Sequence, residues 1–160
     1  MKQRWTANMV LARIVEAYEV QADTEGRVGP KAMASAWPEY RSDFLSIKEE
    51  IDKLNEGNYV QGRNRVRIQR TSRQISQMER ILIGVKQQDK TWTQPWVYRL
   101  RGYRDFHRAV MCHAMWKMHG ISIAKGCKSR RISVRTFADH RKKGTEIIAK
   151  VLNDQGVEVF

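Results

Sequence analysis

Apolar residues recur three and four positions apart in several separate segments of the chain, which is the spacing of one helix face. Thr6 and Ser133 stand where helix N-caps are expected, and Gly57 and Gly120 stand where helices are expected to end. The apolar stripes predict helices over residues 6–21, 42–55, 72–87, 96–118, 122–130 and 133–153. The pattern therefore predicts a small, mostly α-helical protein.

Residues 58–70 depart from this pattern, because apolar and basic side chains alternate there as they do in a short strand. No partner strand is evident in the sequence, so a short hairpin and a basic loop both remain open for this stretch. It also divides the chain. We expect an N-terminal helical part over residues 1–57, which packs, dimerises or binds a partner, and a basic helical part over residues 58–160.

The charge of the chain is large and unevenly placed. The 160 residues carry 30 Lys and Arg against 17 Asp and Glu, a net charge of +13. Residues 1–60 have a net charge of −2, whereas residues 96–150 have a net charge of +11. A basic surface confined to one part of a protein indicates a polyanionic partner, with nucleic acid as the first candidate.

Cysteine content and hydropathy narrow the class of protein. Two cysteines, Cys112 and Cys127, are too few for a disulfide scaffold and favour a reducing compartment. The chain has no run of 18 apolar residues and no signal-peptide pattern at its start. We therefore expect a cytoplasmic protein, located with the nucleic acid of the cell, that does not bind a membrane.

The strongest functional signal is a predicted helix-turn-helix over about residues 121–145, with a turn at Arg131–Ser133. Ile132 is expected to fill the angle between the two helices. Phe137, Ile148 and Leu152 are expected to face inward from the second helix. Gly126 lies inside the first helix at a cost of up to about 1 kcal/mol against Ala, which favours close packing against the second helix.

Arg135 is the candidate for a base contact, because a guanidinium can bond the O6 and N7 atoms of guanine together. A phosphate clamp is an equal alternative for Arg135. Asp139 is expected to orient a neighbouring Arg in preference to reading a cytosine, and His140 to contact a phosphate or simply to fill the surface. The predicted DNA-binding residues on the two helices and their turn are Lys125, Lys128, Arg130, Arg131, Ser133, Arg135, Thr136, Asp139, His140, Lys142 and Lys143. A basic helical hairpin with no role in DNA binding is the alternative for the whole segment.

A second basic cluster precedes the motif. Its arginines, Arg63, Arg65, Arg67, Arg70 and Arg73, have no acidic residue among them. They suit a mobile arm that enters a minor groove or follows a single strand, and we add Arg63, Arg65 and Arg67 to the predicted DNA-binding set. A solvated loop is the alternative.

Several short pieces of the chain match a known pattern: Trp5-Thr6 with Val10, Ala12-Arg13 and Ala17; Ala36-Trp37-Pro38-Glu39; Ile75, Met78-Glu79 and Leu82; and Cys127, Ser133 and Arg135-Thr136. In these pieces the chain resembles a family of small, uncharacterised helix-turn-helix proteins of alphaproteobacteria and their phages. The family's usual Gly before the apolar residue of the turn is Arg131 in this chain. The resemblance implies a DNA-binding domain.

Other chemistry finds weaker support. The Cys and His residues of 107–127 match no zinc-ligand spacing, and no catalytic triad or phosphate-binding Gly loop is present. We therefore expect no enzyme activity, no metal and no cofactor.

The leading hypothesis is a sequence-specific transcriptional regulator of phage or prophage type that binds double-stranded DNA, with RNA polymerase or a second copy of the chain as a further partner. The alternatives are a small terminase-like DNA-packaging subunit and a metal-dependent nucleic-acid enzyme that uses the acidic residues of 39–56.

Overall fold

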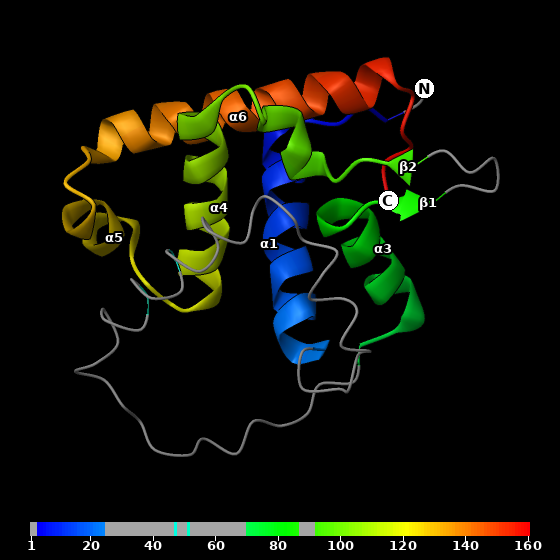
Figure 1. Ribbon diagram of the computed structural model, residues 1–160, viewed down its shortest axis with the longest axis horizontal. Helices are drawn as coiled ribbons and strands as arrows, with labels where there is room; N and C mark the ends of the chain where they lie inside the picture. Colours follow the sequence, from blue (N-terminus) through cyan, green and yellow to red (C-terminus); the bar gives the residue numbers. More distant parts are fainter. Residues whose placement is uncertain (1–2, 25–46, 48–50, 52–69, 87–91) are drawn as a thin grey trace.

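The computed structural model describes residues 3–24, 47, 51, 70–86 and 92–160, and this part of the chain is mostly helical, as the apolar periodicity predicts (Figure 1). The α-helices are α1 (Ala7–Thr24), α3 (Ser72–Leu82), α4 (Arg104–Met118), α5 (Ile123–Ser129) and α6 (Val134–Asp154). A 3₁₀ helix, η2 (Trp96–Leu100), and two short strands, β1 (Val85–Lys86) and β2 (Trp92–Thr93), lie between α3 and α4.

Three expectations fall wholly or largely outside the described residues. Of the helix predicted over residues 42–55, Ile47 and Ile51 are described, and both are helical and buried. The stretch 58–69, which holds the possible hairpin or basic loop together with Arg63, Arg65 and Arg67, is not described, and neither is the expected division of the chain near residue 57.

The helix predicted over residues 72–87 ends one turn early, at Leu82. Gly84 adopts a φ of 86°, in the left-handed region that favours glycine, and the chain leaves the helix there. The strand β1 follows at once and pairs antiparallel with β2, with Val85 opposite Thr93. The hairpin therefore occupies a stretch where the apolar spacing alone still fits a helix.

The single helix predicted over residues 96–118 is two elements. Tyr103, between η2 and α4, has a φ of −127° and a ψ of 70°, outside the helical region. The break changes the direction of the chain, and it lets Leu100 from η2 and Val110 from α4 both approach Gly144 of α6. Both side chains are fully buried, so the break serves the packing of the core.

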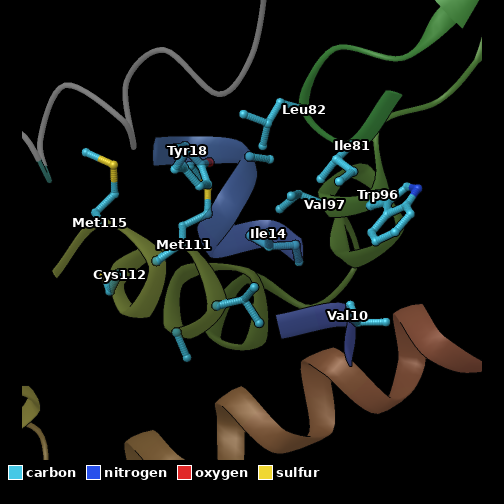
Figure 2. Close-up of a cluster of buried hydrophobic side chains, with 14 of the residues drawn as sticks. Val10, Ile14, Tyr18, Ile81, Leu82, Trp96, Val97, Met111, Cys112 and Met115 are labelled. Carbon is cyan, nitrogen blue, oxygen red and sulfur yellow. The ribbon is translucent and has the colours of Figure 1, made fainter. Parts of the chain in front are cut away.

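The core forms around α1, which packs against α3, α4 and α6. Figure 2 shows Val10, Ile14 and Tyr18 of α1 among side chains of α3, η2 and α4. These residues recur at spacings of four, the periodicity of one helix face. Burial, with a smaller contribution from Cys112, raises the pKa of Tyr18, so its hydroxyl stays neutral within the core.

The long helix α6 lies across the ends of α1 and α4, and α5 folds back beside its N-terminal end, beyond α4 (Figure 1). The other end of α6 is attached to the start of the chain. The Trp5 backbone N–H donates to Asn153 Oδ1 at 2.8 Å, and the Trp5 indole N–H donates to the Val157 carbonyl at 2.9 Å. These bonds attach the C-terminal end of α6 to Trp5, while its N-terminal end lies beside α5.

Candidate nucleic-acid interface

The turn between α5 and α6 is defined by its hydrogen bonds. The Ile132 N–H donates to the Cys127 carbonyl at 3.0 Å, and the Arg131 N–H donates to the Lys128 carbonyl at 3.2 Å. This pair of bonds is a Schellman motif, which requires a left-handed residue after the helix. Arg131 occupies that place with a φ of 55°. Ser133 then begins α6, because its Oγ accepts from the Thr136 N–H at 3.0 Å, which confirms the predicted cap.

Trp116 of α4 holds both helices at this corner. Its buried indole stacks on Phe137 of α6, with ring centroids 5.0 Å apart and an interplanar angle of 26°. On α5, a Cβ atom at residue 126 would lie 2.5 Å from the same indole, so only a glycine fits there without movement. The close approach expected at Gly126 is therefore real, but its partner is α4 and not the second helix of the motif.

The two faces of α6 differ sharply. Phe137, Ile148 and Leu152 are buried, as predicted from their spacing. The opposite face is exposed and polar along its first three turns. The exposed residues of these turns are Ser133, Val134, Arg135, Thr136, Asp139, Lys142, Lys143 and Glu146, of which Val134 alone is apolar.

This exposed face is strongly cationic. Residues 123–143 contain eight Lys and Arg and a single acidic residue, Asp139. Six of the eight cations are exposed, namely Lys125, Lys128, Arg131, Arg135, Lys142 and Lys143, whereas Arg130 and Arg141 are half-buried. Within the described ranges, the ion pairs join Arg13 to Glu16 and Arg70 to Asp23, and neither neutralises this surface.

Three predicted roles change in the structure. His140 is half-buried and packs against Phe106 of α4, with ring centroids 5.4 Å apart, so it faces the protein. Asp139 is exposed and forms no ion pair with an Arg or Lys of the described chain, so the expected orienting contact is not formed. Ile132 does not fill the angle between the helices, because it is 37% exposed and the Trp116–Phe137 stack occupies that place.

Arg141 also faces inward. Its guanidinium lies 3.1 Å from Nδ1 of His113 on α4. Burial first, and then the positive charges of Arg141 and Lys117, lower the pKa of His113 from 6.5 to about 4. The imidazole is therefore neutral at pH 7 and can accept a hydrogen bond from Arg141. This contact links α6 to α4 below the cationic face.

A groove of about 440 Å³ lies beside the same face, between the start of α1 and the middle of α6. Its walls include Thr6, just before α1, and Asn8 from α1, with Asp139 and Lys142 from α6. No sequence pattern marks this groove, because its two walls are more than 120 residues apart along the chain and meet through the packing of α1 under α6.

In the described part of the chain, no group of three His, Cys, Asp or Glu side chains lies close enough together to hold a metal ion. Cys112 and Cys127 are buried and form no disulfide with each other, and burial raises the pKa of Cys127. The acidic residues proposed for a nuclease, in 39–56, fall outside the described residues. No helix within the described ranges is long and apolar enough to span a bilayer.

No protein-family model, curated protein or solved structure matches the chain. The resemblance to small helix-turn-helix proteins therefore stays a prediction.

Proposed function

We propose that the protein binds double-stranded DNA through a helix-turn-helix formed by α5 and α6, with the first half of α6 in the major groove. The observation that carries the proposal is the contrast between the two faces of α6. Its outer face is exposed and cationic over residues 135–143, while Phe137 on its inner face is held by Trp116. A rigid, basic helix end of this kind is what a major groove accepts.

The dimensions and charges support this orientation. An α-helix with its side chains is about 10–12 Å wide, close to the width of about 12 Å of the major groove. Arg135 lies at the start of α6, where a helix end reaches base edges. Lys142 and Lys143 lie two turns further along the same face and suit phosphates at the rim of the groove. Lys125 and Lys128 on α5 are placed to contact the flanking backbone.

The role we propose is that of a sequence-specific transcriptional regulator of phage or prophage type. The support for it is the resemblance to small phage helix-turn-helix proteins and the exposed Arg135, which can distinguish guanine from other bases. The mass of the protein in solution separates this role from DNA packaging. A monomer or dimer agrees with a regulator, whereas a ring of eight or more subunits would indicate a packaging subunit.

The decisive experiment selects bound sequences from a random duplex pool and then measures affinity for the selected duplex by fluorescence anisotropy at several salt concentrations. We expect a preferred sequence, with an affinity that falls steeply between about 50 and 200 mM salt. The Arg135→Ala/Lys142→Ala/Lys143→Ala variant should lose most of this binding. Lys150→Ala removes an exposed cation from the far half of α6 and should bind like the wild type. Absence of duplex binding at low salt would contradict the proposal.

A further inference from the structure

Two apolar side chains stand out at the beginning of α6. Val134 is 50% exposed and Ile132 is 37% exposed. Only two other large apolar side chains in the described ranges, Val85 and Tyr103, are exposed to this degree. Val134 and Ile132 lie on either side of Ser133, in the segment where exposed cations are most concentrated.

The capping of α6 does not account for an apolar residue at Val134, and half of its side chain lies outside the core. The cap that begins α6 is formed by the Ser133 hydroxyl and the Thr136 N–H, without the side chain of Val134. The inward position of the first turn is filled by Phe137 on Trp116. A β-branched residue is also a poor choice for helix propensity. The apolar surface of Val134 is therefore available to a partner.

A partner for this position has to be anionic around Val134 and apolar at one point. The major groove of DNA meets both conditions, because phosphates line its rims and the 5-methyl group of thymine is the one apolar group that its bases present there. Resting on the proposed DNA binding, we infer that Val134 contacts the methyl group of a thymine and so specifies an A·T pair within the recognised sequence.

The position of Arg135 narrows the location of that thymine. Consecutive Cα atoms are about 3.8 Å apart, and successive base pairs are about 3.4 Å apart along the duplex. Val134 and Arg135 are consecutive and both exposed at the start of α6. Their side chains leave α6 about 100° apart, so the thymine lies within the same few base pairs as the base that Arg135 contacts.

An anionic membrane is the competing partner for an apolar pair surrounded by cations. Interfacial helices insert a continuous apolar stripe several turns long. Here the exposed apolar residues are limited to Ile132 and Val134, and the outer face of α6 beyond them carries Arg135, Asp139 and Lys142. The small size of the apolar surface favours contact with a single methyl group.

The test replaces each thymine of the selected duplex in turn by deoxyuridine, which lacks only the 5-methyl group. For the wild type, we expect one replacement to weaken binding about 3- to 5-fold, the effect of one buried methyl group. Val134→Ser should bind the thymine and deoxyuridine duplexes equally, with the affinity of the wild type for deoxyuridine. Ile132→Ser is the matched control and should keep the wild-type ratio. Thermal melting checks that each variant is folded.

Other outcomes would overturn the inference. If no thymine is sensitive in the wild type, or if Val134→Ser keeps the wild-type ratio, Val134 does not read a methyl group, although preferred binding to the selected duplex would still support the proposed function. A change in solution mass or in binding to phosphatidylserine vesicles, with the ratio unchanged, would assign Val134 to a second copy or to a membrane. Failure of the wild type to bind any duplex would remove the proposed function and this inference together.

Discussion

The indole of Trp116 lies so close to Gly126 that a Cβ atom at residue 126 would be 2.5 Å from the ring. The same indole stacks on Phe137 of α6. One buried side chain of α4 therefore sets the position of both α5 and α6. The geometry of the proposed DNA-binding surface depends on a core residue that does not belong to that surface.

Gly126→Ala should destabilise the protein, although Ala is the better helix former. Helix propensity alone would add up to about 1 kcal/mol of stability. The new methyl group would overlap a fully buried indole, and overpacking of this kind costs about 1–3 kcal/mol. We expect the free energy of unfolding in urea to fall by about 1–2 kcal/mol.

Gly102→Ala is the matched control, because a Cβ atom at residue 102 would meet nothing within 4 Å. Its free energy of unfolding should stay within about 0.5 kcal/mol of the wild type. If Gly126→Ala were more stable than the wild type, α5 would not pack on Trp116 as described.

Arg131→Gly should raise the stability of the protein and lower its affinity for DNA. Arg131 holds a φ of 55° in the Schellman turn, which costs a side-chain-bearing residue about 1–2 kcal/mol. Glycine removes that strain and adds about 0.5–1 kcal/mol of backbone entropy cost, so a net gain of about 0.5–1 kcal/mol remains. Urea denaturation and anisotropy measure the two effects separately.

The adjacent Arg130 provides the control for this prediction. It is a right-handed residue with a φ of −85°, so Arg130→Gly relieves no strain. We expect Arg130→Gly to be less stable than the wild type. A loss of stability for Arg131→Gly equal to that of Arg130→Gly would show that the turn is not strained at residue 131.

The sequence predicts the helices well where one apolar stripe is continuous. The stripe of α1 and the cap at Ser133 are both found close to their predicted places. The sequence does not predict the places where the chain bends so that residues far apart along it can pack together. The break before α4 brings Leu100 and Val110 to Gly144, and no local spacing can show that contact.

The exposed face of α6 is likewise predictable, because residues opposite a buried stripe have to face water. What the sequence does not show is which residues other elements cover. His140 has the spacing of a surface residue, but Phe106 of α4 packs on it. The exposure of Ile132 is unexpected for the same reason, since the Trp116–Phe137 stack already fills the angle between the helices.

Arg135→Ala should affect one base of the preferred sequence. If the guanidinium bonds guanine, the loss costs about 1–3 kcal/mol on the selected duplex and flattens the preference at a single position. Repeating the selection with the variant measures this change. An equal loss of affinity on every sequence would show that Arg135 contacts phosphate only.

Lys142→Ala should weaken binding to all duplexes alike. An exposed lysine that contacts a phosphate releases about one counterion, so the slope of log K against log salt should fall by about 1. Lys150→Ala, on the same helix but two turns beyond the cationic residues 135–143, should leave the slope unchanged. A change of base preference for Lys142→Ala would place its side chain in the groove instead of at the rim.

Stability should fall in mild acid because of His113. Burial and the neighbouring Arg141 and Lys117 lower the pKa of His113 from 6.5 to about 4 in the folded protein. As the pH falls below 6.5, the unfolded chain takes up a proton that the folded chain does not accept until about pH 4. We expect His113 to lower the free energy of unfolding by about 1–2 kcal/mol across this window, less than the full pKa shift would give, because water screens the half-exposed ring.

His113→Asn isolates this contribution. The Oδ1 atom of Asn can take the place of Nδ1 and accept from Arg141, but it has no proton to gain. The variant should therefore lose less stability than the wild type between pH 7 and pH 4, as measured by urea denaturation at a series of pH values. The free energies of unfolding of the two proteins should differ most below about pH 5, because the wild type keeps losing stability through His113 as the pH falls from 6.5 to about 4. Parallel pH curves for the two proteins would mean that His113 titrates alike in the folded and unfolded states, and that its contact with Arg141 does not keep it neutral.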